Sequence, residues 1–187
     1  MKQNNIISIL KDHPLIPVVT IHSEDEIDPI IEKLIARNIH CIEVTLRTDF
    51  AFEALELIKK RYSDRITVGV GTVISNHQIE QLKAIGVDFI VSPGLTSELY
   101  NNLAASSIPF IPGVTTPSEI MQAIEFGCEA LKFFPANLFG GIKALKTYAN
   151  VFPQVKFCPT GGINESTHKE YLELSNVLSV GGSWMVK

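Results

Sequence analysis

Residues 41–47 read Cys-Ile-Glu-Val-Thr-Leu-Arg, a short run of strand length that is rich in apolar and β-branched side chains. Such a run predicts a strand of a buried sheet. Similar runs recur along the chain with starts 19 to 25 residues apart, at residues 16–21, 66–70, 89–91, 108–111, 130–134, 155–158 and 177–180. The sequence therefore repeats one strand-containing unit eight times.

Stretches with helical periodicity lie between these runs. Residues 24–37, for example, place Ile27, Ile31 and Leu34 on one stripe. Regular alternation of strand and helix predicts parallel strands with the helices packed outside them. Eight units without a linker predict a single (β/α)8 TIM barrel over residues 1–187, with a short N-terminal helix. A doubly wound open sheet is the alternative.

Composition narrows the class of protein further. The chain has 187 residues, 45% of them hydrophobic and 19% charged, which suits one globular domain. A net charge of −4 gives no reason to expect binding to nucleic acid or to an anionic membrane. The apolar run at residues 6–10 is too short for a signal peptide or a membrane span. We expect a cytoplasmic protein.

The cysteines predict neither a disulfide framework nor a metal site. Cys41, Cys128 and Cys158 are widely spaced, each lies in an apolar stretch, and none forms a CxxC pair. They are expected to be small buried side chains in a reducing compartment. The five histidines do not have metal-ligand spacing either, so we expect no metal.

Alternate side chains of residues 41–47 point to opposite faces of the predicted strand. Ile42 and Val44 belong to an aliphatic face that suits the outer helices. Glu43 and Arg47 belong to the other face, about 13 Å apart along the strand. Each is therefore free to contact a ligand at the barrel mouth. The alternative is an interior network of ion pairs.

A single lysine interrupts the apolar sequence Ala-Leu-Lys-Phe-Phe-Pro at residues 130–135. Burial of an unpaired ammonium is costly, so Lys132 either pairs with a carboxylate or gives up its proton. A neutral lysine amine is a nucleophile that can form a Schiff base with a carbonyl compound. An ion pair with Glu43 is the structural alternative, and it is compatible with catalysis.

Two glycine pairs, Gly161-Gly162 and Gly181-Gly182, follow the last two predicted strands. In (β/α)8 barrels these two loops commonly bind phosphate, because glycine lets backbone N–H groups approach an anion closely. Ser183 adds a hydroxyl donor beside the second pair. These loops predict a phosphate-binding site.

Seven segments together resemble the class I 2-dehydro-3-deoxy-phosphogluconate (KDPG) aldolases. They are Ile-Glu-Val-Thr-Leu-Arg-Thr at 42–48, Val-Gly-Val-Gly-Thr-Val at 68–73, Ser-Pro-Gly at 92–94, Ile-Pro-Gly at 111–113, Leu-Lys-Phe-Phe-Pro-Ala at 131–136, Phe-Cys-Pro-Thr-Gly-Gly-Ile at 157–163 and Val-Gly-Gly-Ser-Trp at 180–184. The resemblance implies reversible cleavage of 2-dehydro-3-deoxy-6-phospho-D-gluconate to pyruvate and D-glyceraldehyde 3-phosphate, as in the Entner–Doudoroff pathway. It also implies a homotrimer that needs no cofactor.

The same resemblance assigns roles to individual residues. Lys132 matches the Schiff-base lysine, Glu43 the general acid and base, and Arg47 the residue that holds the pyruvate carboxylate. Thr72 matches a second group at the pyruvate end, although its direction stays open. The remaining matches are the phosphate-loop residues Gly161, Gly162, Gly182 and Ser183 and the pocket-wall residues Thr160 and Phe134.

Three alternatives stay open at this point. The same mechanism serves the C4 epimer 2-dehydro-3-deoxy-6-phosphogalactonate or the substrate 4-hydroxy-2-oxoglutarate, and a catalytically silent barrel would only bind a phosphorylated sugar acid. The sequence also stops at Lys187, six residues after Gly181. We therefore expect the final outer helix to be missing, either from the barrel or only from this chain.

Overall fold

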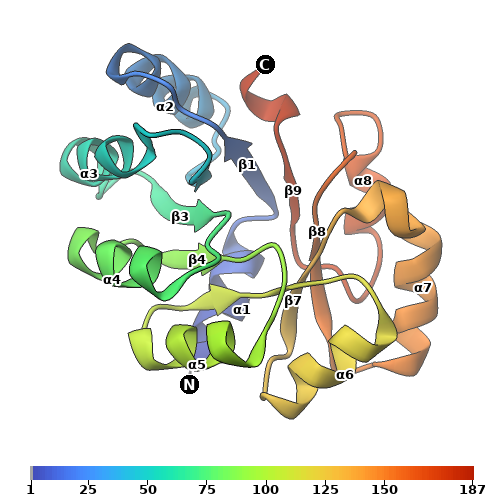
Figure 1. Cartoon of the computed structure of the whole chain (residues 1–187). Helices are drawn as coiled ribbons and strands as arrows, with labels where there is room; N and C mark the ends of the chain where they lie inside the picture. Colours follow the sequence, from blue (N-terminus) through green and yellow to red (C-terminus); the bar gives the residue numbers. More distant parts are fainter. Residues whose placement is uncertain (1) are drawn as a thin grey trace.

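Parallel strands form the centre of the molecule, and helices surround them (Figure 1). The computed structural model describes residues 2–187, with side chains from residue 5 onward, so Met1 of the predicted 1–187 domain lies outside the described residues. Every strand pairing within these residues is parallel. The predicted α/β class with parallel strands is therefore confirmed.

The elements alternate along the chain much as the sequence predicts. The strands are β1 (Leu15–Val19), β2 (Cys41–Thr45), β3 (Thr67–Gly71), β4 (Phe89–Val91), β5 (Phe110–Ile111), β6 (Gly113–Val114), β7 (Ala130–Phe133), β8 (Lys156–Pro159) and β9 (Val180–Gly182). The α-helices are α1 (Lys2–Asp12), α2 (Ile27–Ala36), α3 (Ala51–Tyr62), α4 (Asn76–Ile85), α5 (Ser97–Ser106), α6 (Pro117–Glu125), α7 (Gly141–Val151) and α8 (His168–Leu172). Short 3-10 turns are η1 (Glu24–Glu26), η2 (Ala136–Phe139) and η3 (Trp184–Val186).

The strands are arranged in two hydrogen-bonded sheets. Six strands pair in the order β5-β4-β3-β2-β1-β9, and three pair in the order β6-β7-β8. Isolated bridges join Phe157 to Val177 and Thr160 to Gly181, next to β8 and β9. The sequence predicts one closed barrel of eight strands, whereas the hydrogen bonds define two parallel sheets that bridges connect.

The strand expected at residues 108–111 corresponds to β5, which is shorter, and a separate strand, β6, follows Pro112. Proline has no N–H group, so it cannot donate a hydrogen bond to a strand ladder. β5 ends before Pro112 and pairs with β4, while β6 begins after it and pairs with β7. The carbonyl of Pro112 still accepts a hydrogen bond from the Lys132 N–H at 2.8 Å. The strand after the proline, β6, was not predicted.

The last strand lies further along the chain than the expected residues 177–180. β9 pairs with β1 in a register that joins Leu15 to Val180 and Pro17 to Gly182. The ladder therefore runs through the glycine pair, and the apolar run before it contributes only an isolated bridge at Val177. Pairing with β1, which the local sequence does not reveal, sets these bounds.

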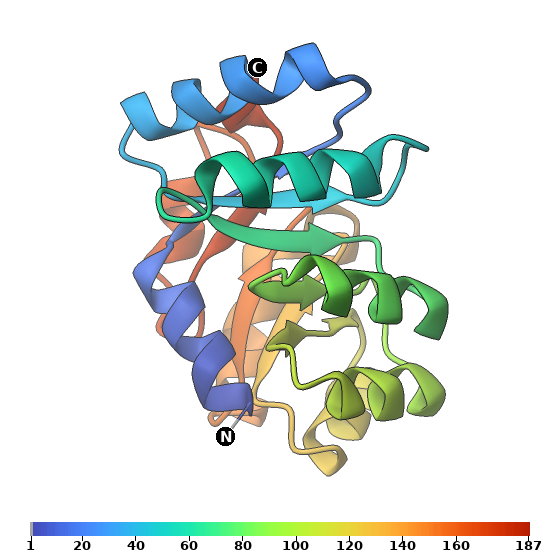
Figure 2. The ribbon, with the colours of Figure 1, turned by 90° about the vertical axis from the view of Figure 1, so that its left-hand side faces the viewer.

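Two hydrophobic clusters occupy opposite faces of the strands. Ile42 and Val44 of β2 pack in the larger cluster, which contains side chains of the outer helices. Cys41 packs in the smaller cluster with Ile6 and Leu10 of α1. Figure 2 shows α1 lying across the ends at which the strands begin. Because α1 covers these ends, a ligand-binding site is expected at the opposite, carboxyl ends of the strands.

The three cysteines are free and buried, as the sequence predicts. Burial raises the pKa of the Cys128 thiol to about 12 and that of the Cys158 thiol to about 11. Burial also raises the pKa of Cys41, and the nearby Glu43 carboxylate adds to this shift. Thiols with raised pKa values stay protonated and react poorly as nucleophiles.

His13 joins the end of α1 to the first residue of β3, because its Nε2 lies 3.1 Å from Thr67 Oγ1. Burial lowers the pKa of His13, Asp12 opposes the shift, and His40 adds to it. The unfolded chain therefore binds this proton more readily, so stability is lost as the pH falls below about 6.5. We expect the urea-derived free energy of unfolding to fall on acidification, and less steeply in His13→Gln.

The control for this prediction is His77→Gln, which removes an exposed histidine of α4 and should keep the wild-type pH dependence. Measurements at several pH values across the histidine range compare the two slopes. A slope that is the same in His13→Gln and the wild type would contradict the prediction.

Candidate active site

Lys132 of β7 and Glu43 of β2 form a buried ion pair. Lys132 Nζ lies 3.3 Å from Glu43 Oε1, and the two residues are 5% and 3% exposed. Removal of one partner would leave an uncompensated buried charge, so each group needs the other. The sequence analysis gives this ion pair as the structural alternative to a catalytic role of Lys132. It also brings an amine and a carboxylate close enough for proton transfer.

Strand alternation explains why Lys132 lies on this side of the strand. Its neighbours Leu131 and Phe133 pack in the larger hydrophobic cluster, so Lys132 lies on the opposite face. Its Nζ lies 5.0 Å from the centre of the Phe134 ring. A cation at this distance is attracted to the aromatic face. The amine therefore lies between a carboxylate and an aromatic wall.

Gly71, the last residue of β3, leaves the space that the Glu43 carboxylate occupies. A Cβ at this position would overlap Glu43 Oε1. This role of Gly71 was not predicted, although a glycine next to a predicted strand often marks a close approach of another group. Gly71 therefore fixes where the carboxylate can lie.

Arg47 and Thr72 meet beside this pair. Arg47 Nε donates a hydrogen bond to Thr72 Oγ1 at 3.2 Å. Thr72 has φ of 65°, in the left-handed region that β-branched residues rarely adopt. Such backbone strain tends to occur at functional sites. The structure thus settles the direction of Thr72, whose hydroxyl points to the guanidinium.

A cavity of about 550 Å³ opens where β1, β8 and β9 end. Seven of the predicted site residues line it, namely Arg47, Phe134, Thr160, Gly161, Gly162, Gly182 and Ser183. Lys132 adjoins this cavity through Phe134, and Thr72 adjoins it through Arg47. The structure therefore brings together predicted site residues from the ends of β2, β3, β7, β8 and β9.

The loop after β8 needs its two glycines. Gly161 has φ of 101° and Gly162 has φ of 71°, which favour glycine strongly. A Cβ at Gly162 would also overlap the side chain of Asn137. The backbone N–H groups of Ala136 and Asn137 bind the carbonyls of Thr160 and Gly161 at 2.9 and 3.1 Å. The loop is therefore held against η2 in a shape that a larger residue would disturb.

The hydroxyl of Thr160 is buried beside the cavity. Among the described residues, its Oγ1 is buried and has no hydrogen-bond partner. Buried polar atoms without a partner are rare in folded proteins. Thr160 lines the cavity as a wall residue, while its Oγ1 is enclosed by the protein next to Gly181.

Thr20 is a cavity-lining residue that the sequence analysis missed. It directly follows β1, and its hydroxyl lies 2.9 Å from Thr45 Oγ1. A polar residue at the carboxyl end of a barrel strand is the sequence signal for such a position.

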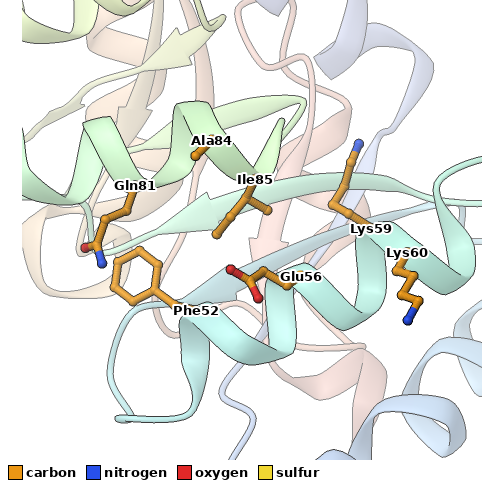
Figure 3. A pocket seen from close by; sticks show the side chains of 7 residues that line it. All are labelled: Phe52, Glu56, Lys59, Lys60, Gln81, Ala84 and Ile85. Carbon is orange, nitrogen blue, oxygen red and sulfur yellow. The ribbon is translucent and has the colours of Figure 1, made fainter.

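A second hollow, of about 470 Å³, lies on the outside of the molecule between α3 and α4 (Figure 3). Phe52 and Glu56 of α3 face α4 there, and Lys59 bonds Asp88 at 3.0 Å. None of the predicted site residues lines this hollow, whereas seven of them line the cavity described above. It is a groove between two surface helices and is separate from the candidate site.

Within residues 2–187, no three His, Cys, Asp or Glu side chains are grouped as a metal ion would require. None of the helices in the same range has both the length and the apolar character of a membrane span.

Comparison with known proteins places this geometry in a family. The family model described as KDPG and KHG aldolase matches residues 6–187. The Escherichia coli (strain K12) protein named KHG/KDPG aldolase is 42% identical over 179 residues, which are 96% of this chain and 84% of that protein. A Dickeya dadantii protein named 2-dehydro-3-deoxy-phosphogluconate aldolase is 43% identical over 95% of this chain and 83% of its own length.

Solved structures give the same result. The KDPG aldolase of Legionella pneumophila, with pyruvate captured as a covalent carbinolamine, has a TM-score of 0.91 at 47% identity and covers 95% of this chain and 86% of its own. The Zymomonas mobilis aldolase with 3-phosphoglycerate has a TM-score of 0.93 at 40% identity, over 97% and 86% of the two chains. The family match over nearly the whole chain and these relatives lead to one conclusion. The chain belongs to the KDPG and KHG aldolase family.

Proposed function

We propose that the protein is a class I aldolase, a carbon–carbon lyase that cleaves 2-dehydro-3-deoxy-6-phospho-D-gluconate to pyruvate and D-glyceraldehyde 3-phosphate. The observation that carries the proposal is the buried Lys132–Glu43 pair beside the cavity. Arg47 suits the carboxylate end of such a substrate, and the two glycine loops suit its phosphate. Relatives of about 42% identity are named for this activity.

Formation of the Schiff base is the first chemical step. A proton moves from Lys132 Nζ to Glu43 Oε1 across the 3.3 Å contact, which leaves a neutral amine and a carboxylic acid. The amine attacks the C2 ketone of the substrate and forms a carbinolamine. Glu43 then donates its proton to the carbinolamine hydroxyl, which departs as water. The product is a protonated imine.

Cleavage of the C3–C4 bond follows. Glu43, now a carboxylate, accepts the proton of the C4 hydroxyl as the bond breaks and the aldehyde forms. The bond electrons move into the iminium system, so an enamine forms in place of a high-energy carbanion. Protonation at C3 and hydrolysis of the imine release pyruvate and regenerate Lys132.

Binding groups at the two ends fix the scissile bond between them. The Arg47 guanidinium binds the substrate carboxylate bidentately, and Thr72 Oγ1 positions that guanidinium. Gly161, Gly182 and Ser183 bind the phosphate through backbone N–H groups and a hydroxyl. Interactions with this non-reacting phosphate supply binding energy that orients the reacting centre.

A second activity of the same site is cleavage of 4-hydroxy-2-oxoglutarate. The family description and the name of the E. coli relative both include KHG, the abbreviation for the 4-hydroxy-2-oxoglutarate substrate. These names favour 4-hydroxy-2-oxoglutarate over the galactonate epimer as a second substrate. The chemistry at Lys132 is identical, because both substrates have a ketone at C2 and a hydroxyl at C4.

The finer features of the fold also belong to the proposal. The parallel strands form one (β/α)8 barrel over residues 1–187. The bridges at β8 and β9 support this proposal, as does the smaller hydrophobic cluster, which contains residues of both sheets.

We further propose a homotrimer. Leu138 and Phe139 of η2, which are 72% and 49% exposed, supply apolar surface for it. Cytoplasmic location stays a prediction from the sequence.

Pyruvate release, followed by reduction with lactate dehydrogenase, tests the function directly. We expect turnover of the gluconate-series substrate, slower turnover of its C4 epimer, and turnover of 4-hydroxy-2-oxoglutarate. A chelator should leave all rates unchanged, because the Schiff-base route needs no metal. Binding of the phosphorylated substrate without pyruvate release would favour the catalytically silent barrel instead.

Gly71→Ala tests the placement of the Glu43 carboxylate. The added methyl displaces the carboxylate, and a displacement of about 1 Å costs roughly 100-fold in turnover. Gly94→Ala is the matched control, since a Cβ at Gly94 meets nothing within 4 Å. Comparison of kcat in the pyruvate assay decides the point. Equal kcat values for the two variants would contradict the role of Gly71.

A further inference from the structure

Thr20 lies between the two ends of the cavity that the substrate is proposed to span. It directly follows β1, and β1 pairs with β2 on one side and with β9 on the other. β2 leads to Arg47, and β9 leads to Ser183, so the two anion-binding ends lie on either side of Thr20. A group at this position faces the middle of a bound substrate.

The hydrogen bonds of Thr45 fix what Thr20 offers to a ligand. Thr45 is fully buried, and its Oγ1 lies 3.1 Å from the Val19 carbonyl oxygen and 2.9 Å from Thr20 Oγ1. A carbonyl can only accept, so the single hydroxyl hydrogen of Thr45 is donated to Val19. Thr20 must then donate its own hydrogen to Thr45. The oxygen of Thr20, in the cavity wall, is left as an acceptor.

An acceptor in the middle of the cavity suits a hydroxyl group of the substrate. This step rests on the proposed function. Between the C1 carboxylate and the C6 phosphate, the substrate carries hydroxyls at C4 and C5. Glu43 takes the proton of the C4 hydroxyl during cleavage, whereas nothing described above binds the C5 hydroxyl. We propose that Thr20 accepts a hydrogen bond from the C5 hydroxyl and so selects aldehydes that carry it.

The condensation direction isolates this contact, because the C2 hydroxyl of glyceraldehyde 3-phosphate becomes the C5 hydroxyl of the product. Pyruvate is condensed either with D-glyceraldehyde 3-phosphate or with 3-phosphooxypropanal, which lacks that hydroxyl. Thr20→Val should lower kcat/KM about tenfold for the hydroxylated aldehyde and leave the deoxy aldehyde unchanged. Thr20→Ser, which keeps the oxygen, should restore most of the preference.

Thr48→Val is the matched control. Thr48 also uses its hydroxyl in a hydrogen bond, to the backbone carbonyl of Ile21 at 2.6 Å, but Thr48 does not line the cavity. Its removal should leave the ratio of the two aldehydes at the wild-type value. A fall in this ratio equal to that of Thr20→Val would overturn the assignment.

Two other outcomes also overturn the proposal. If Thr20→Val lowers kcat/KM equally for both aldehydes, Thr20 is a structural residue. If it changes kcat/KM for neither aldehyde, Thr20 does not bind the C5 hydroxyl. Exchange of the C3 protons of pyruvate into solvent involves no aldehyde and should be unaffected by Thr20→Val. If the wild-type chain shows neither exchange nor condensation, the proposed function fails first, and the Thr20 assignment fails with it.

Discussion

Replacement of Lys132 by methionine is expected to lower aldol cleavage by roughly 10⁴-fold or more, the scale seen when a nucleophile is removed from a covalent mechanism. Methionine fills a similar volume but has no amine, so no iminium forms to accept the electrons of the C3–C4 bond. Phe134 and the cavity wall remain in place. Pyruvate release by Lys132→Met should therefore fall to the background rate.

Trapping identifies the reacting residue independently of the rate. Borohydride added with pyruvate should inactivate the wild-type protein irreversibly and add the reduced pyruvyl mass to the peptide that contains Lys132. Lys143→Met, which removes a lysine of α7, should be labelled as the wild type is. A label on Lys143, or no label at all, would refute the assignment of Lys132.

Stability must be measured alongside activity in this variant. Loss of the ammonium leaves Glu43, 3% exposed, as a buried carboxylate without its partner. Breaking a buried pair in this way costs about 3–5 kcal/mol. The double variant Lys132→Met with Glu43→Gln removes both charges and should recover much of that loss. An inactive but stable double variant separates the chemical role of Lys132 from its role in folding.

The alternation of side chains along β2 and β7 is sufficient to predict that Glu43 and Lys132 point away from the outer helices. Glu43 lies between the outward residues Ile42 and Val44, and Lys132 lies between Leu131 and Phe133. A strand has a side-chain period of two, so a few adjacent residues determine the face of each side chain. This part of the site can be derived from the sequence because it depends on no distant contact.

The sequence did not predict the features that depend on neighbouring strands. The space for Glu43 comes from Gly71, on β3, and the free acceptor of Thr20 depends on hydrogen bonds made by Thr45, on β2. The break at Pro112 depends on which neighbour each half of the strand finds. Lateral pairing joins residues far apart in the chain, and one sequence without that pairing does not determine it.

Glu43→Gln is expected to lower kcat by about 10³-fold, within the range for loss of a general acid and base. Glutamine keeps the volume of the carboxylate beside Gly71 and can still accept a hydrogen bond from Lys132 Nζ, 3.3 Å away in the wild type. It cannot receive or return a proton. Pyruvate binding, which depends on Arg47, should change little. Steady-state rates and a pyruvate titration measure the two effects separately.

The matched control is Glu26→Gln, because Glu26 lines the same cavity but uses its carboxylate to accept a hydrogen bond from the His22 N–H at 2.9 Å. It should keep kcat near the wild-type value. A parallel fall of kcat and pyruvate affinity in Glu43→Gln would make Glu43 a binding or structural residue.

Borohydride trapping measures formation of the imine in Glu43→Gln separately from cleavage. Glu43 also supplies the proton that removes water from the carbinolamine, so formation of the imine with pyruvate should be slowed in this variant. Glu43→Gln should therefore accumulate the trapped adduct more slowly than the wild type, as well as failing to cleave the C3–C4 bond at the wild-type rate.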